Sequence, residues 1–543
     1  MPHLTGGEAL VKSLVRHGVR VVFGLPGVQI YGAVCALRDE RGMRFIQTRH
    51  EGSTSYMADG YARAGGTFGT ALVVPGPGLL NTMGGLSTAY SASSPVLMIS
   101  GQVPRSQLGK RIGVLHEVDD QLDAVAPVTK WRKRILDARD TPAVVREAVH
   151  QMLSGRPRPV VIDMPWDTMQ EEVDVELLGP LPIERPIPDR TSLDRAVELL
   201  LASRRPLVYA GGGVHLSGAH ELLGALAEQL QAGVVTTAEG KGAVSDHATH
   251  SLGAAVWAGS PLRQYMDQAD LVLAVGTRLA LGGFKPDMQV IHIDADPEEI
   301  GRNHKKTIGL VGDARATLQA LLDRVRAGGA RDSRKAEWES LRARVVETGA
   351  TEPQASINAA LREGIPEDAV LIAGMTQLGY YSRPFFPVYH PRTYINSSYS
   401  GNLGFEYPTA LGAKVARPDK PVVATIGDGG FFYNSQEMAT AVQHRINVVA
   451  VVFNDQAYGN VARDLDHGWG GAFGAELQNP DFLKLADAYG MTGMRAKDPG
   501  DVGKLVRDAI QLDRPVLIEV PVGRMPRPLF FTELKPPAKY ASR

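Results

Sequence analysis

The sequence predicts an α/β protein made of three doubly wound domains, each built around a parallel sheet. Three observations support this fold class. The chain has 543 residues, which is too long for a single hydrophobic core. Short apolar, β-branched runs alternate with helix-like segments along the chain. Two linkers divide it: residues 177–190 carry four prolines, and residues 326–335 read RAGGARDSRK.

We therefore expect an N-terminal domain over residues 1–175, a central domain over 191–325 and a C-terminal domain over 355–543. The same order of strand, loop and helix recurs in each of them. The predicted buried strands lie in VRVVFGLPG (19–27), GTALVVPGPG (69–78), SPVLMISGQ (94–102) and RPVVIDMP (158–165), then RPLVYAGGG (205–213), AGVVTTAEGKG (232–242), ADLVLAVGTR (269–278) and QVIHIDADP (289–297), and finally AVLIAGMTQ (369–377), PVVATI (421–426), NVVAVVF (447–453) and RPVLIEVPVG (514–523).

Composition limits the classes of function. The net charge is −1, so the chain lacks the basic surface of a nucleic-acid-binding protein, and we expect no nucleic-acid partner. No run approaches the ~20 apolar residues of a membrane span, and the N-terminus lacks an apolar signal core. The only cysteine is Cys35, which excludes an intrachain disulfide and suits a reducing compartment. We expect a cytoplasmic protein with no membrane partner.

One stretch of the third domain points to a metal site. A β-branched run ends in GDGG (427–430), and the next one ends in Asn454. Residues 434–437, NSQE, have the pattern of a helix N-terminus with a capping box. In a βαβ unit the two strands are parallel, so Asp428 and Asn454 should meet at one sheet edge, where such sheets bind ligands. A carboxylate and an amide oxygen suit Mg²⁺, and glycines let backbone N–H groups approach a phosphate. A turn closed by an Asx cap is the simpler alternative.

This pattern resembles the fingerprint of the thiamine diphosphate-dependent enzymes, in which Gly-Asp-Gly precedes an asparagine pair. Here the pair is Asn454-Asp455. The resemblance covers nearly the whole chain, in the domain order of acetolactate synthase, pyruvate oxidase and benzoylformate decarboxylase. It implies thiamine diphosphate as cofactor and Mg²⁺ bound by Asp428, Asn454 and the backbone carbonyl of Gln456. The cofactor's diphosphate end would lie against Gly427, Asp428, Gly429, Gly430, Gln377, Asn454, Tyr458 and Gly459.

The first domain contains the motifs that would bind the cofactor's pyrimidine ring. In RHEGSTSYMADGYAR (49–63), Glu51 falls at the family's activating glutamate. The resemblance implies that its carboxyl shares a proton with a pyrimidine nitrogen, while the cofactor supplies the reactive carbon. Taken alone, Glu51 would be interpreted as a solvated carboxylate at a helix start. The other residues of this half are Pro26 and Gly27 in FGLPG (23–27), and Gly76 and Asn81 in VPGPGLLNTMGGLSTAY (74–90).

Residues 395–414, INSSYSGNLGFEYPTALGAK, resemble the segment that keeps the cofactor bent. There a bulky apolar side chain, here Leu403, separates the two rings. A backbone carbonyl, here that of Gly401, accepts a hydrogen bond from the aminopyrimidine. Bending brings the two reacting atoms of the cofactor together, which is a proximity effect. Simple core packing is the alternative for Leu403.

Whether the central domain binds FAD stays open. The synthases and pyruvate oxidases hold FAD there, and Arg278 and residues 291–303 resemble their segments. Residues 211–228 follow a strand but lack a clean GxGxxG, so tight strand–helix packing explains them at least as well. Residues 254–260 and 279–287 depart from the FAD-binding relatives.

Other departures from the synthases concern the substrate. The tryptophan that helps them select a second keto acid is Asp464 here, and a histidine near their diphosphate site is Leu378. In VLHEVDDQLD (114–123), His116 becomes a candidate catalytic group that can relay a proton near neutral pH. A surface-loop histidine that caps a helix is the alternative.

We expect decarboxylation of a small-molecule 2-oxo acid followed by carboligation to a second carbonyl compound. The alternatives are a non-ligating decarboxylase, an FAD-dependent oxidase of the pyruvate type, and an inactive homologue kept for assembly. The presence of Glu51, Asp428 and Asn454 argues against the inactive homologue. The resemblance also implies a homodimer or homotetramer, with each site between the N-terminal domain of one subunit and the C-terminal domain of another.

Overall fold

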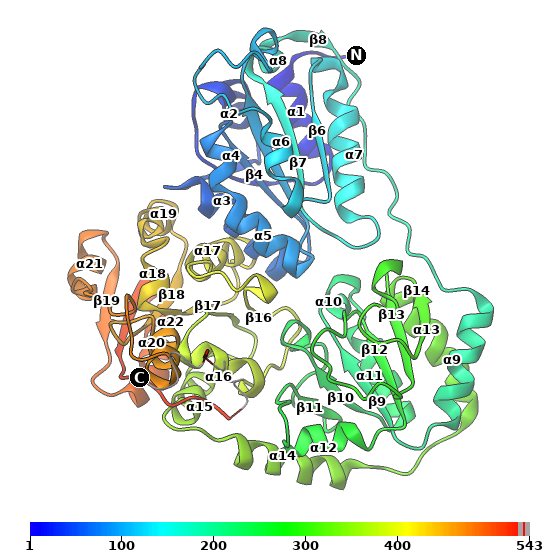
Figure 1. Ribbon diagram of the computed structural model, residues 1–543. Coiled ribbons are helices and arrows are strands. Elements are labelled where there is room, and N and C mark those ends of the chain that lie inside the picture. Colours follow the sequence, from blue (N-terminus) through cyan, green and yellow to red (C-terminus); the bar gives the residue numbers. More distant parts are fainter. Residues whose placement is uncertain (530–535, 538–543) are drawn as a thin grey trace.

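The computed structural model describes residues 1–529 and 536–537 and has three α/β lobes (Figure 1). Each lobe contains a six-stranded parallel sheet flanked by helices, so the predicted fold class is confirmed. The end of the predicted C-terminal domain, residues 530–535 and 538–543, lies outside the described part. One feature was not predicted: β1 (His3–Thr5) and β8 (Glu172–Asp174) pair antiparallel and join the two ends of the N-terminal lobe.

The N-terminal lobe has the strand order β3-β2-β4-β5-β7-β6, which reverses between β2 and β4. The loops after these two strands carry the motifs predicted to bind the pyrimidine ring. The strands are β2 (Val21–Gly24), β3 (Arg44–Gln47), β4 (Gly69–Val73), β5 (Val96–Gln102), β6 (Trp131–Arg134) and β7 (Val160–Pro165). The helices are α1 (Gly6–Arg16), α2 (Tyr31–Asp39), α3 (Glu51–Gly65), α4 (Pro77–Asn81), α5 (Met83–Ala92), α6 (Gln121–Ala124), α7 (Thr141–Leu153) and α8 (Trp166–Gln170).

The C-terminal lobe repeats the strand order of the N-terminal lobe, as β16-β15-β17-β18-β20-β19. The predicted βαβ unit is present, with β17 and β18 as parallel neighbours. The strands are β15 (Val370–Ala373), β16 (Tyr394–Ile395), β17 (Val422–Gly427), β18 (Val448–Asn454), β19 (Thr492–Arg495) and β20 (Val516–Pro521). The helices are α15 (Gln354–Gly364), α16 (Gln377–Phe385), α17 (Glu406–Ala416), α18 (Asp428–Phe431), α19 (Met438–His444), α20 (Gly459–Gly468), α21 (Phe482–Ala488) and α22 (Val502–Gln511).

The central lobe has a different order, β11-β10-β9-β12-β13-β14, which reverses between β9 and β12. Its strands are β9 (Pro206–Ala210), β10 (Gly233–Thr236), β11 (Ser251–Gly253), β12 (Leu271–Val275), β13 (Val290–Asp294) and β14 (Thr307–Val311). Its helices are α9 (Arg190–Ala202), α10 (Gly213–Ser217), α11 (His220–Leu230), α12 (Pro261–Asp267) and α13 (Ala314–Val325), and α14 (Lys335–Gly349) leads into the C-terminal lobe.

The N- and C-terminal lobes share one buried core, centred on the packing of α3 against α17 (Figure 1). The two helices approach so closely that only glycine fits at the crossing. A Cβ on Gly60 would lie 2.0 Å from the carbonyl oxygen of Thr409. A Cβ on Gly412 would lie 1.9 Å from that of Met57. This contact fixes the position of α3, which begins at Glu51, relative to the C-terminal sheet.

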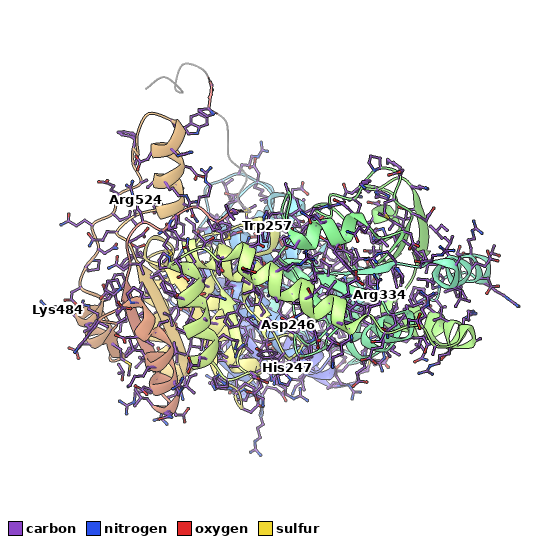
Figure 2. All side chains as sticks on the ribbon, turned by 90° about the horizontal axis from the view of Figure 1, so that it is seen from below. Asp246, His247, Trp257, Arg334, Lys484 and Arg524 are labelled. Atoms are coloured by element: carbon purple, nitrogen blue, oxygen red, sulfur yellow. The ribbon has the colours of Figure 1, made fainter. Side chains whose placement is uncertain are left out.

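The central lobe is attached to the C-terminal lobe on the face shown in Figure 2, where Asp246 and His247 lie. The carboxylate of Asp246 accepts the backbone N–H of Val388 at 2.8 Å. The ring of His247 stacks on Tyr389, and its Nε2 lies 3.1 Å from the Glu367 carboxylate. Among the helices of the described chain, none combines the length and the apolarity needed to cross a bilayer.

Candidate functional site

Asp428 and Asn454 meet at the carboxyl edge of the C-terminal sheet, as predicted. Asp428 is buried at the start of α18, directly after β17, and Asn454 is the last residue of β18. The Nδ2 group of Asn479 donates to both, at 2.6 Å to Asp428 Oδ2 and 3.0 Å to Asn454 Oδ1. Because one donor reaches both oxygens, they are neighbours at this edge of the sheet. A carboxylate and an amide oxygen are ligands that Mg²⁺ accepts.

Two neighbours orient Asn454 so that its oxygen, rather than its nitrogen, faces Asp428. Its Nδ2 donates to Glu519 Oε1 at 2.8 Å, and the other oxygen of that carboxylate accepts from Arg495 Nε at 2.6 Å. The third predicted ligand, the backbone carbonyl of Gln456, accepts the N–H of Leu477 at 2.7 Å. A carbonyl oxygen has a second lone pair, so this bond leaves it able to bind a cation.

The glycine turn after β17 is tighter than predicted, because a helical turn begins at once with Asp428. A Cβ on Gly429 would lie 2.6 Å from the ring of Tyr458, so Tyr458 packs directly on the turn. A Cβ on Gly427 would meet the methyl group of Thr376 at 3.3 Å. The predicted capping box at 434–437 is wrong: Asn434 makes no side-chain capping bond, and the Glu437 side chain contacts the N-terminal lobe.

Gln377 lies beside the same turn, as predicted. Its Nε2 donates to Asp455 Oδ2 at 2.7 Å, and Gly459 leaves room for this pair, since a Cβ there would lie 2.1 Å from that oxygen. Its Oε1 accepts the N–H of Met525. Burial, and then the charge of Asp428, raise the pKa of Asp455 well above its ordinary value. A protonated Asp455 resembles the neutral asparagine that the fingerprint has at this position.

The predicted pyrimidine-side residues also lie together, in the N-terminal lobe. Glu51 is half-buried at the first position of α3, and its Oε2 accepts from Asn81 Nδ2 at 3.1 Å. Gly76 has a positive φ of 59° and packs against the backbone carbonyl of His116, 2.3 Å from where its Cβ would be. Pro26 and Gly27 follow β2, and a Cβ on Gly27 would meet Val74 at 2.4 Å.

His116 is therefore next to the Gly76 loop, but it does not cap a helix. Helix α6 is capped by Asp120, whose side chain accepts the N–H groups of Leu122 and Asp123. The capping alternative for His116 is wrong. Its ring is half-buried, and its Nδ1 lies 3.1 Å from Gln29 Oε1.

Leu403 is half-buried and belongs to none of the apolar clusters formed by the described residues, which disfavours simple core packing. Gly401, with φ 65°, ends the short turn before it. Asn402 between them donates to the hydroxyl of Tyr56 on α3 and to the carbonyl of Gly84 on α5, each at 3.1 Å. The segment is thus tied to the N-terminal lobe on the side where α3 begins.

Two residues aligned with synthase substrate residues have other partners in this structure. Leu378 is buried in the core of the C-terminal lobe. Asp464 lies on α20, which continues to Gly468, and its Oδ1 accepts from Arg527 at 2.8 Å. The charge of Asp464 is therefore paired, which weakens the expected repulsion of an anionic acceptor.

The central lobe holds a cavity of about 520 Å³ where its strand order reverses. Gly211, Gly212 and Gly213 follow β9 and line it, as does Arg278 after β12. The glycines also pack tightly, since a Cβ on Gly213 would lie 2.6 Å from the Cα of Gly276. Both interpretations of this segment, packing and ligand binding, therefore fit the structure. Open α/β sheets bind ligands at such a reversal, and the order three-two-one-four-five-six is found in dinucleotide-binding domains.

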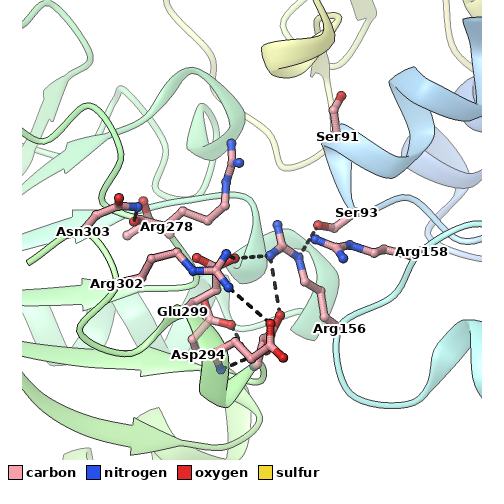
Figure 3. Close-up of polar contacts among 12 residues, drawn as sticks. Ser91, Ser93, Arg156, Arg158, Arg278, Asp294, Glu299, Arg302 and Asn303 are labelled. Atoms are coloured by element: carbon pink, nitrogen blue, oxygen red, sulfur yellow. Dashed lines mark hydrogen bonds and ion pairs between the residues drawn. The ribbon is translucent and has the colours of Figure 1, made fainter. Parts of the chain in front are cut away.

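Charged groups surround this cavity (Figure 3). Arg156 donates to Glu299 at 2.7 Å and to the hydroxyl of Ser93 at 2.8 Å, which links the N-terminal and central lobes. The Arg278 guanidinium lies 4.0 Å from the centre of the Tyr399 ring. Burial raises the pKa of Asp294, at the end of β13, to about 6.

Several residues of the site were missed from the sequence. Asn479 contacts Asp428 and Asn454, Glu519 contacts Asn454, and Gln121 accepts the N–H of Gly76 at 3.0 Å. None of them belongs to a motif with fixed spacing, so the sequence alone carries no signal for them. Glu437 did lie in a recognised pattern, the capping box at 434–437, but that pattern predicted a contact within its own helix.

Comparisons with known proteins agree with this geometry. Three family descriptions match the chain: the N-terminal TPP binding domain of thiamine pyrophosphate enzymes over residues 4–125, the central domain over 193–321, and the C-terminal TPP binding domain over 374–520. A probable acetolactate synthase large subunit of Methanocaldococcus jannaschii is 33% identical, over 95% of this chain and 92% of its own length. Acetolactate synthase isozyme 3 large subunit of Escherichia coli is 32% identical, over 96% and 95%. A probable 2-ketoarginine decarboxylase of Pseudomonas aeruginosa is 36% identical, over 93% and 91%.

Proposed function

The chain belongs to the thiamine pyrophosphate enzymes that act on 2-oxo acids, and on that premise we propose that it decarboxylates a 2-oxo acid and joins the product to a second carbonyl compound, with Mg²⁺. The observation that carries this proposal is the contact of Asn479 with both Asp428 and Asn454. It shows that the side-chain oxygens of the two residues in the family's metal motif are neighbours. When bound, thiamine diphosphate supplies a nucleophilic carbon and the electron sink that decarboxylation needs.

The residues of the C-terminal lobe would hold the cofactor. Asp428, Asn454 and the Gln456 carbonyl would bind Mg²⁺, and Gly429 and Gly430 would leave the backbone open to the diphosphate. Glu519 and Arg495 would keep the amide oxygen of Asn454 directed at the metal.

The other residues would act on the reacting end of the cofactor. Glu51 would hold a proton at its carboxyl and share it with the pyrimidine ring, with Asn81 fixing the carboxyl's orientation. Leu403 would keep the two rings apart, and the Gly401 carbonyl would accept from the amino group. His116 would donate or accept a proton near the reacting carbon.

Carboligation is supported by the acetolactate synthases among the relatives, which match over more than nine-tenths of both chains. A non-ligating decarboxylase is the second candidate. It is supported by the relative named as a 2-ketoarginine decarboxylase and by Asp464, which stands where the synthases have a tryptophan for the second substrate.

A substrate screen tests the proposal. Protein supplied with thiamine diphosphate and Mg²⁺ is incubated with 2-oxo acids of neutral, anionic and cationic side chain, alone and paired with aldehydes or a second oxo acid. CO₂ release and products are both followed. Carboligation predicts a ligated product in at least one pair. Aldehyde as the only product would support the second candidate, and no CO₂ from any acid would contradict both.

For the central cavity, we propose a nucleotide-containing ligand such as FAD. The strand order, the glycines after β9 and the half-buried carboxylate of Asp294 in the lining support this class of ligand. Residues 254–260 and 279–287 stay the sequence argument against FAD itself. Absorbance at the flavin bands, with chromatography of the denatured supernatant, distinguishes FAD from a colourless adenine nucleotide, and neither one present after reconstitution would contradict the proposal.

We also propose that the enzyme is a homodimer or homotetramer with sites between subunits. The resemblance to the family, in which the N-terminal domain of one subunit faces the C-terminal domain of another, supports this arrangement.

A further inference from the structure

Asn434 and Glu437 have a function that a helix cap does not explain. They lie between the metal-binding Asp428 and helix α19, and both are buried. Neither side chain closes the helix of its own lobe. Both instead contact the N-terminal lobe, at the two ends of the short segment that contains Glu51.

Glu437 holds the backbone just before Glu51. Its Oε1 accepts the N–H of Arg49 at 3.1 Å and the N–H of His50 at 3.0 Å, and its Oε2 accepts the Arg49 N–H at 3.2 Å. The hydroxyl of Thr440 donates to Oε2 at 2.5 Å. The side chain is fully buried, so these N–H and O–H groups replace the water that would otherwise solvate the carboxylate.

Asn434 binds the side chain of Ser53, two residues after Glu51, and joins it to the cofactor-bending segment. Its Oδ1 accepts from the Ser53 hydroxyl at 3.0 Å, and its Nδ2 donates to the Gly404 carbonyl at 2.7 Å. One amide therefore contacts the helix that begins at Glu51 and the residue that follows Leu403. Both atoms of the amide are used, which fixes its orientation.

We propose that Asn434 and Glu437 are positioning residues that hold the Arg49–Ser53 turn, and with it the Glu51 carboxyl, at a fixed position against the C-terminal lobe of the same chain. The proposal rests on the proposed role of Glu51. We name this pair of residues the cross-lobe clamp. Proton sharing requires hydrogen-bond distance, and a displacement of about 1 Å costs on the order of a hundredfold in rate.

The first test needs no cofactor. Full-length Glu437→Ala should expose the N–H groups of Arg49 and His50, so amide hydrogen exchange in a peptide covering 47–52 should rise at least about tenfold. Gln443→Ala is the matched control. Gln443 lies on α19, which follows Glu437 directly, and also contacts Arg49, but through the arginine side chain, at 3.0 Å. Its exchange pattern should match wild type.

The second test uses the protein reconstituted with thiamine diphosphate and Mg²⁺. Glu437→Ala should leave cofactor affinity by calorimetry within about threefold and slow exchange of the cofactor's C2 proton by about a hundredfold. Glu437→Gln should recover part of the loss, because an amide oxygen still accepts one N–H. If Glu437→Ala does not fold, Glu437→Gln carries the test and should lie between wild type and Glu51→Gln.

A double variant separates positioning from general stability. The effects of two substitutions do not add when one residue acts only through the other. Glu437→Ala in a Glu51→Gln background should therefore slow C2 exchange no further. Additive losses, or wild-type exchange in both Glu437 variants, would overturn the inference. Absence of C2 exchange in the wild-type protein would instead contradict the proposed function, so the two failures are distinguishable.

Discussion

Glu51 is the residue on which the proposed chemistry depends most directly. Glu51→Gln should keep a hydrogen bond with Asn81 and leave cofactor affinity within a few fold, since the C-terminal lobe is untouched. The amide cannot carry a shared proton, so C2 exchange should slow by about 10² to 10⁴. Nuclear magnetic resonance of quenched cofactor measures this rate, and exposed Glu476→Gln is the control. A variant that exchanges as fast as wild type would remove Glu51 from the mechanism.

Glu406 gives a prediction about pH. It is buried at the start of α17, its Oε1 accepts the N–H of Met375 at 3.0 Å, and its Oε2 makes no hydrogen bond with the described residues. Burial raises its pKa from 4.5 to about 7. Because the folded-state pKa is raised, the stability linked to this group is complete below its unfolded pKa and is lost as pH rises through about 7. The loss amounts to roughly 3 kcal/mol at alkaline pH.

Glu406→Gln should therefore remove this part of the pH dependence, because glutamine does not titrate. The measurement is the difference in Tm between wild type and variant from pH 5 to 9, without cofactor or metal. The difference should move in favour of the variant as pH rises from 5 to about 7 and should level off above that. A constant difference across the range would show that Glu406 does not titrate in this window.

The sequence predicted some residues of the site and not others for a physical reason. Asp428 and Asn454 end adjacent parallel strands, so their meeting follows from strand geometry and needs no knowledge of the fold beyond it. Asn479 and Glu437 reach their partners through tertiary contacts that no spacing encodes. Glu437 was misassigned because a local pattern competes with a partner from a distant part of the chain.

At the scale of elements, the crossing of α3 and α17 is the contact least tolerant of change. Gly60→Ala places a methyl group 2.0 Å from a carbonyl oxygen, and we expect a loss of about 3 kcal/mol in the free energy of unfolding. Gly224→Ala on α11 is the matched control, because its Cβ would meet only His250 at 3.9 Å. It should be neutral or gain up to about 1 kcal/mol. Urea unfolding measures both, and equal effects would contradict the packing described for the crossing.

Helix α20 gives a prediction about the second substrate. It keeps its helical register through Asp464, which the prediction from the sequence had to assume. A carboxylate paired with Arg527 offers a short alkyl chain no aromatic surface to pack against. We expect no preference for 2-oxobutyrate over pyruvate as acceptor. Steady-state competition between the two measures it, and acetohydroxybutyrate as the main product would contradict the prediction.

Elements were predicted well where both faces of a strand are buried, since β17 and β18 differ from the predicted runs only at their ends. The short β1–β8 pair was missed because three-residue strands leave no periodicity to detect. The turn at Asp428 was predicted as a loop that leads to one helix. It is a separate helical turn because Tyr458 packs on Gly429 and closes it.

At the scale of the whole molecule, mixing two inactive variants tests whether sites span subunits. Glu51→Gln damages the N-terminal half of a site, and Asp428→Ala damages the C-terminal half. If each site uses both halves from different chains, refolding an equal mixture should restore about a quarter of the sites through mixed dimers. If each site lies within one chain, no mixture regains activity. Activity per milligram after co-refolding measures this, with each variant refolded alone as the control.

Three domains could be predicted from length, linkers and the repeated order of strand and helix. The order of strands within each sheet could not, because the same succession of strands and helices is compatible with both orders seen here. The strand order matters for function because ligands bind where it reverses. Of the three sheets, that of the central lobe reverses between its first and fourth strands, β9 and β12. The shared order of the two terminal lobes was likewise invisible in the sequence.

The crossing of α3 and α17 also has a consequence for synthesis on the ribosome. The N-terminal lobe is complete hundreds of residues before α17 is translated, yet α3 packs more extensively on α17 than on any other single element. During that interval the nascent chain exposes a surface suited to chaperones or to aggregation. A fragment of residues 1–175 should accordingly be poorly soluble on its own, and co-expression with residues 355–543 should rescue it.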